Sequence, residues 1–414
     1  MVSREFTRVV FITNLDVLGG TENNLISIVA HPDFYKSVES YLFSGTRPHQ
    51  VIEDGLKYTS VRIFQHNRFL GLRLPKIFRA TNFKRLIREV NPDLVVFWNH
   101  VAKSRQLEIC KHQGIKTIFF ERGTGWSSHD SEAMNRFLHG VDKVLANTYA
   151  GKRRLMELWG YQGECHVLHN ALRPEIAKVE ATPKSLPVNR PVRIGVAARL
   201  VAYKGVASVV LAMHELQKEG LEAELHVAGD GVEGDKLRTL ARDLNVQAVF
   251  HGVRQDMTSF YKYIDILVVP SIREPIGTVA IEAQALGCPV LATAVDGLPE
   301  VIQHNLTGWV VKPSWDIRKY LGYTAQKKDI PSLVFYPHLD RLGQPLALDP
   351  RDIANLVLEV VKNKYFYSKM SENAINFVQE NFKFNEYIDR IIGLISCTPT
   401  ATAHTPSVIK DDSA

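Results

Sequence analysis

The sequence predicts an α/β protein built from two doubly wound, Rossmann-like domains. Short apolar runs that are typical of buried parallel strands alternate with helical segments in both halves of the 414-residue chain. A polar, proline-bearing stretch over 173–191 separates the halves and is interpreted as a linker. The apolar fraction of 45% and the charged fraction of 23% are those of an ordinary globular protein, and the length suffices for two or three domains.

The first predicted domain spans residues 1–172. Its strands are expected at Val9–Thr13, Tyr41–Phe43, Leu94–Trp98, Thr117–Phe120 and Lys143–Thr148. Gly19 and Gly20 lie between the first strand and a helix expected over Leu25–Ala30, so their backbone amides are exposed in front of a helix. Such amides can approach a phosphate or an acceptor molecule, which makes Gly20 a candidate binding residue.

The second predicted domain spans residues 192–365 and begins with a strand over Val192–Leu200. Arg199 and Lys204 flank the loop at the carboxyl end of that strand, where open α/β sheets bind their ligands. Two cations there could hold a diphosphate, the arginine as a planar fork and the lysine as a point charge. The alternative is a basic loop that is merely solvated.

The stretch from Pro270 to Pro289 contains two glutamates, Glu274 and Glu282, with seven residues between them. It follows an apolar strand and predicts a sharp loop, then a helix that starts near Gly277. Glu274 would lie in the loop, where its carboxylate can bind a polyol, and Glu282 would lie one to two turns into the helix, where it can bind a ribose. The alternative is a buried strand-to-helix turn with two surface glutamates.

The start of this helix predicts an anion site. The first backbone N–H groups of a helix have no partner within the helix, and here they belong to Gly277, Thr278 and Val279. Gly277 would let the backbone come close to the anion. A site that binds a diphosphate, a polyol and a ribose side by side would suit a nucleotide sugar.

The frame Ser271-x-x-Glu274-x-x-Gly277-x-x-x-x-Glu282-Ala283 resembles that of retaining glycosyltransferases of the family-4 type, the group 1 glycosyltransferases, which have the two-domain GT-B fold. Further segments resemble those of the family in the expected order: Gly19–Glu22, Val167–Leu172, Ala198–Gly205, Gly229–Glu233, Phe250–Arg254, Asp296–Ile302 and Asn305–Val311. Ala198 stands where the family usually has glycine. The segment Gly229–Gly234 also fits G-x-G-x-x-G, a dinucleotide pattern that is weak when it occurs alone.

The resemblance implies two Rossmann-like domains that face each other across a cleft, and transfer of a hexose-type sugar from a nucleoside-diphosphate sugar to an acceptor hydroxyl with retention. The implied catalytic residues are Glu274, Arg199 and Lys204. The implied donor-binding residues are Gly20, Arg199, Lys204, Arg254, Glu274, Gly277, Thr278, Val279 and Glu282. The chain contains no Asp-x-Asp sequence, so no metal or other cofactor is expected. The expected acceptor is a glycan or glycolipid, as in the synthesis of lipopolysaccharide or other surface glycans.

Two alternatives stay open: a nucleotide-sugar 2-epimerase on a similar fold, and a non-catalytic sugar-nucleotide-binding protein. The chain also departs from the family on the acceptor side, because relatives commonly have a histidine after the strand Thr117–Phe120. Here Glu121 or Arg122 occupies that position, or His129 reaches back from the following loop. Neither the base and sugar of the donor nor the linkage follows from these residues.

The net charge of +6 and the pI near 9.0 favour an anionic partner. A nucleic acid is not expected, because the chain shows no nucleic-acid-binding motif. The segment Arg68–Arg88 has seven cations, no acid and an amphipathic spacing, which predicts either contact with an anionic membrane surface or a core-facing helix. Scattered cysteines, no spanning apolar run and no signal peptide predict a cytoplasmic protein, with peripheral contact at the inner face of the plasma membrane.

The C-terminal part of the chain is predicted in three pieces. Residues 314–348 read as an irregular insertion in the second domain, without an assigned role. Helices are expected at Arg351–Lys364 and Lys369–Ile395, and residues 366–396 are expected to cross back to the first domain, as in the resembling family. The polar tail over 397–414 is expected to be disordered.

Overall fold

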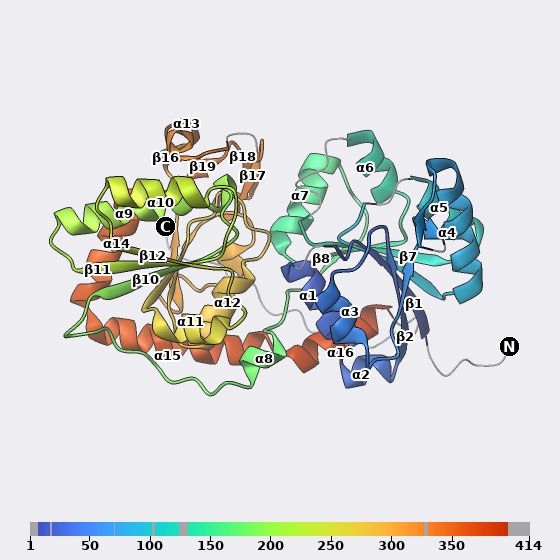
Figure 1. The fold of residues 1–414 in the computed structure, drawn as a ribbon, viewed down its shortest axis with the longest axis horizontal. Coiled ribbons are helices and arrows are strands. Elements are labelled where there is room, and N and C mark those ends of the chain that lie inside the picture. Colours follow the sequence, from blue (N-terminus) through green and yellow to red (C-terminus); the bar gives the residue numbers. More distant parts are fainter. Residues whose placement is uncertain are drawn as a thin grey trace.

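A computed structural model describes residues 7–16, 19–69, 71–101, 104–123, 131–326 and 330–395. It contains two lobes that lie side by side, each built on a parallel sheet (Figure 1). The strands of the first sheet are β1 (Thr7–Thr13), β2 (Val38–Ser44), β3 (Arg62–Gln65), β6 (Leu94–Trp98), β7 (Lys116–Glu121), β8 (Lys143–Ala146) and β9 (Cys165–Val167). Those of the second are β10 (Val192–Ala197), β11 (Ala223–Ala228), β12 (Ala248–Gly252), β13 (Ile266–Val269), β14 (Val290–Thr293) and β15 (Gly308–Val311).

Both sheets are doubly wound. The first has the order β3-β2-β1-β6-β7-β8-β9 and the second the order β12-β11-β10-β13-β14-β15. The strand order therefore reverses between β1 and β6 and between β10 and β13, the points at which such sheets bind ligands outside their carboxyl ends. The predicted α/β class with two Rossmann-like domains is confirmed.

The helices of the first domain are α1 (Gly20–Val29), α2 (Pro32–Tyr35), α3 (Gln50–Leu56), α4 (Lys76–Val90), α5 (Ser104–His112), α6 (Ser131–Leu138) and α7 (Tyr149–Trp159). Helix α1 begins five residues earlier than predicted, because Gly19 caps it. The Gly19 N–H donates to Glu22 Oε2 over 3.1 Å, which satisfies one of the free amides at this end. Burial raises the pKa of the Glu22 carboxyl.

The segment Arg68–Arg88 is not one amphipathic element. It forms a two-stranded hairpin of β4 (Arg68–Phe69) and β5 (Leu72–Arg73), followed by α4. Phe83 and Leu86 of α4 are buried in the core of the first domain, as expected for a core-facing helix. Phe69, Leu72, Ile77 and Phe78 are 48%, 75%, 70% and 53% exposed, so this segment presents four apolar side chains to solvent.

The second domain surrounds its sheet with α9 (Val206–Lys218), α10 (Gly234–Asp243), α11 (Met257–Tyr263), α12 (Thr278–Ala285), α14 (Pro350–Lys362) and α15 (Lys364–Asn381). The stretch before it contains α8 (Pro174–Ala177) and otherwise has no helix or strand. Apolar side chains of α9, α14 and the strands form one core cluster, and those of α12 with the other face of the sheet form a second.

Residues 314–348 are more ordered than predicted. They contain β16 (Trp315–Asp316), α13 (Ile317–Tyr320), β17 (Val334–Tyr336), β18 (Arg341–Gly343) and β19 (Leu346–Ala347). The hairpin of β17 and β18 reaches α7 of the first domain, where the Leu342 N–H donates to Glu157 over 3.0 Å and Asp340 pairs with Arg153 over 3.0 Å. This segment therefore joins the domains.

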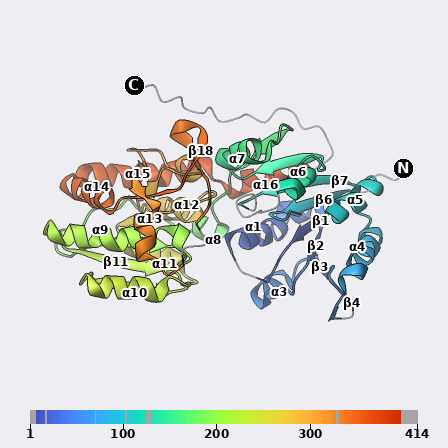
Figure 2. The ribbon, with the colours of Figure 1, turned by 90° about the horizontal axis from the view of Figure 1, so that it is seen from above.

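The chain returns to the first domain through α16 (Phe384–Ile395), which follows α15 along the two lobes (Figures 1 and 2). Tyr387, Ile388 and Ile391 of α16 pack in the core of the first domain. The single helix predicted over Lys369–Ile395 is interrupted near Phe382, whose carbonyl accepts a hydrogen bond of 2.9 Å from the Leu172 N–H instead of continuing the helix. The predicted tail lies outside the described residues.

A second contact between the domains caps a helix. Glu300 of the second domain accepts hydrogen bonds from the Tyr149 and Ala150 N–H groups, at 2.6 and 2.8 Å, and from His169 Nε2 at 2.8 Å. A carboxylate at the N-terminus of α7 accepts hydrogen bonds from the free amides of the helix and interacts favourably with the helix dipole. The relative position of the domains is therefore fixed by polar contacts as well as by the returning helix.

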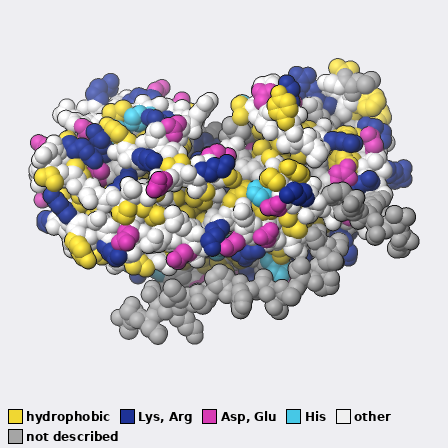
Figure 3. Space-filling model, turned by 90° about the horizontal axis from the view of Figure 1, so that it is seen from below, with side chains coloured by type: hydrophobic (Ala, Val, Ile, Leu, Met, Phe, Trp, Pro, Cys, Tyr) yellow, Lys and Arg dark blue, Asp and Glu magenta, His cyan; other side chains and the backbone are white. Residues whose placement is uncertain are grey.

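The charges on one face of the molecule are mixed in sign (Figure 3), and the described helices include no membrane span. On the face seen in Figure 3, Lys and Arg side chains are interspersed with Asp and Glu. Among the described helices, none has both the length and the apolar character that crossing a bilayer requires.

Candidate active site

A cavity of about 290 Å³ lies between the two domains. From the first domain it is lined by α1, including Gly20, and by the loop after β9. From the second domain it is lined by the ends of β10 and β11, by Arg254, and by Thr278, Val279 and Glu282 of α12. Five of the nine predicted donor-binding residues thus meet at one cavity, although they come from both halves of the chain.

Glu282 is the acidic group of this cavity, with a side chain only 5% exposed. Arg173 Nε donates to its Oε1 over 2.7 Å and the Tyr261 hydroxyl donates to its Oε2 over 2.9 Å. Burial raises the pKa of Glu282, while the Arg173 guanidinium acts in the opposite direction. A carboxylate offers about four lone-pair positions, so two remain that could accept hydrogen bonds from the hydroxyls of a ribose.

Glu274 and Lys204 form an ion pair near α12. Lys204 Nζ lies 2.5 Å from Glu274 Oε2, which also accepts a 3.2 Å hydrogen bond from the Ser271 hydroxyl. Lys204 ends a 3-10 turn over Ala202–Lys204, in the loop between β10 and α9, and its side chain is 16% exposed. An ammonium group has three donors, so Lys204 keeps two N–H groups for a ligand while it holds Glu274. Neither residue lines the 290 Å³ cavity.

Gly277 is required by the backbone at the start of α12. It caps the helix with a φ of +78°, in the left-handed region that favours glycine. A Cβ atom at this position would lie 2.5 Å from a methyl carbon of Leu298. This close packing places the first amides of α12, those of Thr278 and Val279, at the cavity.

Arg199 is a predicted site residue that forms no hydrogen bond or ion pair with the other predicted site residues in the structure. It is exposed just beyond β10, and no described side chain forms a hydrogen bond or an ion pair with it. It does not line the cavity. Its guanidinium is therefore available to a ligand, but no contact in the structure positions it.

Asp296 anchors the loop that carries Glu274. It is fully buried and accepts hydrogen bonds from the Glu274 N–H at 2.9 Å and from the Phe335 N–H at 3.0 Å. Burial raises its pKa to about 7, against the opposing effect of these two hydrogen bonds. The segment 314–348 thus contacts the site as well, because Phe335 belongs to β17.

At the predicted acceptor side, Glu121 is the last residue of β7 and Arg122 follows it, and both residues are buried. Glu121 accepts a 2.5 Å hydrogen bond from the Gly123 N–H. Arg122 donates to Asn170 over 2.8 Å and to the Tyr387 hydroxyl over 3.3 Å, and its guanidinium lies 4.6 Å from the centre of the Trp98 ring. Arg122 thus ties the cavity-lining Asn170 to α16. His129 lies outside the described residues.

Three residues that shape the site were not predicted from the sequence. Arg173 and Tyr261 hold Glu282, and Asp296 holds the Glu274 loop. Arg173 directly follows the Val167–Leu172 segment, and Asp296 begins the Asp296–Ile302 segment. Their positions beside or within these family-like motifs could have marked them as site residues. Among the described residues, no three His, Cys, Asp or Glu side chains gather in the way a metal site requires.

Comparison with known families agrees with this geometry. A model described as "Glycosyltransferase Family 4" matches residues 36–175, and one described as "Glycosyl transferases group 1" matches residues 178–324. The two matches together cover more than half of the chain and meet at the linker. The chain belongs to the group 1, family-4 type of glycosyltransferases.

Individual relatives resemble parts of the chain. An uncharacterised glycosyltransferase of Methanocaldococcus jannaschii is 37% identical over 32% of this chain and 38% of its own length. The lipopolysaccharide core biosynthesis glycosyltransferase LpsE of Rhizobium meliloti is 27% identical over 56% of this chain and 65% of its own length. The chain therefore matches less than two thirds of the length of either relative.

A solved structure shares the whole fold. HepE of Anabaena, crystallised with UDP and glucose, superposes with a TM-score of 0.72 at 16% identity, over 94% of this chain and 99% of its own. This likeness confirms the GT-B arrangement of the two domains.

Proposed function

We propose that this glycosyltransferase moves a hexose-type sugar from a nucleoside-diphosphate sugar to an acceptor hydroxyl with retention of configuration. The observation that carries the proposal is the cavity between the domains. It combines the amide end of α12 with the buried carboxylate of Glu282, and the Lys204–Glu274 pair lies beside that helix. Amides and ammonium suit a diphosphate, and carboxylates suit neutral hydroxyls.

The proposed chemistry needs no side-chain nucleophile. The diphosphate leaves from the face on which the acceptor hydroxyl attacks, and one of its oxygens takes the hydroxyl proton. Negative charge then grows on the diphosphate, where Lys204, Arg199 and the first amides of α12 would stabilise the transition state more than the ground state. Glu274 would bind sugar hydroxyls near the reacting carbon.

The relatives support transfer over the alternatives. HepE was crystallised with UDP and with UDP-glucose, and LpsE is named for lipopolysaccharide core biosynthesis. By this likeness we propose a nucleotide-sugar donor and a role in the synthesis of lipopolysaccharide or another surface glycan. A 2-epimerase is not favoured by the family matches, and Lys204, Glu274 and Glu282 are all present, which argues against a protein that only binds.

The donor is tested by thermal stabilisation. A ligand that binds only the folded chain stabilises it by mass action, so one of a panel of UDP-, GDP- and ADP-sugars is expected to raise the unfolding temperature in a concentration-dependent way. Glu282→Gln should reduce that rise, and Glu219→Gln, an exposed glutamate after α9, should leave it unchanged. A panel without any stabilising donor would contradict the proposal.

We further expect activity to survive a metal chelator. The charge of the leaving diphosphate is assigned to Lys204, Arg199 and α12, and the sequence has no Asp-x-Asp with which to hold a cation against it. Transfer should therefore proceed at an unchanged rate in excess EDTA. A chelated enzyme that is inactive and recovers with manganese would contradict this assignment.

We also propose peripheral contact with an anionic membrane through α4 and the preceding hairpin. This segment exposes Phe69, Leu72, Ile77 and Phe78 and carries exposed cations as well. Arg79 and Arg85 donate to Leu74 O and Asn82, and Arg85 pairs with Glu89, so these two arginines have structural partners. Lys76, Lys84 and Arg88 have none among the described side chains, which makes them the cations that are free to meet lipid.

Vesicle binding tests this contact. Each cation near an anionic surface contributes about 1 kcal/mol, so replacing Lys76, Lys84 and Arg88 by serine should weaken binding to anionic vesicles by about two orders of magnitude at low salt. Serine at Lys218, Lys236 and Lys262, three exposed lysines of the second domain, is the matched control and should change little. Equal binding by both triple variants would show that the first three cations are simply solvated.

A further inference from the structure

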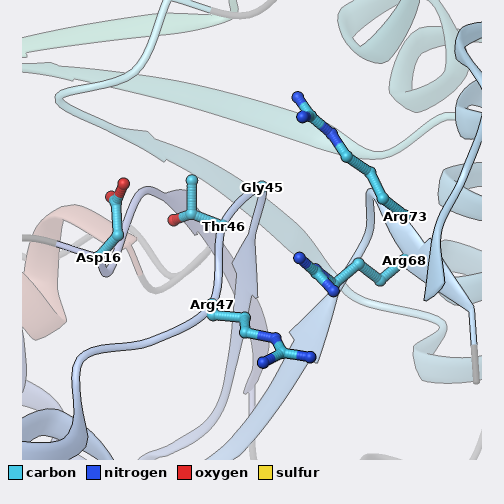
Figure 4. Close-up of a pocket in the computed structure, with 6 residues that line it drawn as sticks. All are labelled: Asp16, Gly45, Thr46, Arg47, Arg68 and Arg73. Carbon is cyan, nitrogen blue, oxygen red and sulfur yellow. The ribbon is translucent and has the colours of Figure 1, made fainter. Parts of the chain in front are cut away.

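A second pocket, of about 280 Å³, lies in the first domain (Figure 4). Its lining residues are Asp16, Gly45, Thr46, Arg47, Arg68 and Arg73. Asp16 follows β1, Gly45 to Arg47 follow β2, and the two other arginines belong to the hairpin that follows β3. These segments all leave the sheet at its carboxyl edge, the edge at which doubly wound sheets bind ligands.

The pocket concentrates positive charge. Arg68 and Arg73 are directly opposite each other in the β4–β5 pair, and like charges in that relation destabilise a hairpin. Arg47 extends toward Arg68 from the opposite loop, and Arg73 lines the same pocket but extends away from these two (Figure 4). Asp16 lies on the side of Thr46 that faces away from the arginines (Figure 4). An anion between the arginines would relieve this repulsion.

The guanidinium groups are available to a ligand. In the described part of the chain, the side chains of Arg47 and Arg73 have no hydrogen-bond or ion-pair partner, and both residues are exposed. Arg68 donates one N–H to the Gly71 carbonyl, at 2.7 Å, and its other N–H groups are available to a ligand. Arginine presents its donors in a fork that matches a phosphate or a carboxylate.

Hydrogen bonds position the loops before any ligand binds. The buried Asn82 of α4 donates to the carbonyls of His66 and Arg68, at 3.0 and 3.1 Å, and so holds the hairpin. Asn67 donates to the Gly45 carbonyl over 3.2 Å and joins the hairpin side to the β2 loop. A pocket whose walls are already connected needs little reorganisation to bind an anion.

We infer that this pocket binds a phosphate group carried by the acceptor. The inference rests on the proposed function, because only a transferase needs an acceptor beside the donor. Three arginines and one acid leave a balance of two positive charges, which suits the charge of a phosphate monoester near neutral pH. Asp16 lines this pocket and Gly19 lines the donor cavity, so the two sites have lining residues three positions apart in the chain.

Binding of inorganic phosphate tests the pocket without any transfer reaction. The background is Lys204→Ala, which weakens phosphate binding at the donor site, and ionic strength is held constant with chloride. Arg47→Ala and Arg73→Ala should each weaken phosphate binding by about tenfold, on the scale of one charge-assisted hydrogen bond. Arg62→Ala is the control, because Arg62 is an exposed arginine at the amino edge of the same sheet.

Two further measurements separate the outcomes. In a transfer assay with full-length enzyme, Arg47→Ala should raise the acceptor KM about tenfold and leave the donor KM unchanged. Phosphate binding that is absent, or equal in Arg47→Ala, Arg73→Ala and Arg62→Ala, would overturn the inference even if a donor stabilises the chain. Conversely, a chain that binds phosphate here but responds to no donor refutes the proposed function instead.

Vesicle binding distinguishes a phosphate carried by a lipid from one carried by a soluble acceptor. Wild type and Arg47→Ala/Arg73→Ala are compared on phosphatidylcholine vesicles with and without phosphatidic acid. A loss of binding that is confined to phosphatidic acid assigns the pocket to a lipid-borne phosphate. Unchanged vesicle binding, together with weaker binding of inorganic phosphate, assigns it to a soluble acceptor.

Discussion

Replacing Lys204 by alanine is expected to lower the turnover of the enzyme by about two orders of magnitude or more, the scale on which a preorganised charge donor acts. Lys204 is held in place before any donor binds, because its Nζ lies 2.5 Å from Glu274 and its side chain is only 16% exposed. Fixed and partly shielded, its charge can act on the leaving diphosphate without reorganisation. The turnover with a donor identified by thermal stabilisation is the quantity to measure.

The Lys204 result needs two comparisons. Lys218→Ala removes an exposed lysine at the end of α9 in the same domain and should leave turnover unchanged. Arg199→Ala should cost less than Lys204→Ala, because no contact orients Arg199. Lys204 also neutralises the buried Glu274, so the unfolding temperature of each variant must be compared with that of the wild type. Full turnover in a folded Lys204→Ala variant would contradict the role assigned to this lysine.

The parts of the fold that leave a strong local pattern in the sequence were predictable. Buried runs such as Leu94–Trp98 and Ile266–Val269 lie in the middle of their sheets, so every residue of each is apolar and the strand is unmistakable. The helix after Gly277 was predictable because glycine at a positive φ and the Gly287–Pro289 turn mark its two ends. The hairpin β4–β5 was missed because strands of two residues have no measurable period.

The contacts that complete the site could not be predicted, because they join residues far apart in the chain. Arg173 was assigned to a polar linker, yet it reaches Glu282, 109 positions away. The segment 314–348 has irregular composition, yet the Phe335 N–H donates to Asp296 and so contacts the loop of Glu274. The local sequence pattern predicts which residues form a helix or strand, but only the tertiary structure determines which polar groups form hydrogen bonds with each other.

Replacing Arg173 by alanine is expected to destabilise the folded chain by about 1–3 kcal/mol, the usual cost of taking a hydrogen-bond partner from a buried polar group, because Glu282 is buried while the Arg173 side chain is 35% exposed. The charge left behind is that of Glu282, whose side chain is 5% exposed and which still accepts the hydrogen bond from the Tyr261 hydroxyl at 2.9 Å. Urea unfolding near neutral pH measures the loss. Arg238→Ala is the control, since it breaks an exposed pair with Asp235 and should cost no more than about 1 kcal/mol.

A double variant separates the lost pair from lost packing. In Arg173→Ala/Glu282→Gln the buried charge is gone while an amide oxygen can still accept the hydrogen bond from Tyr261, so much of the stability should return. If the double variant is as unstable as Arg173→Ala, the cost lies in the packing of the arginine. If Arg173→Ala costs no more than Arg238→Ala, water replaces the guanidinium and the pair is not buried in solution. Recovery in the double variant would show that Arg173 stabilises the chain by partnering the carboxylate of Glu282, the group whose two remaining lone-pair positions could receive ribose hydroxyls.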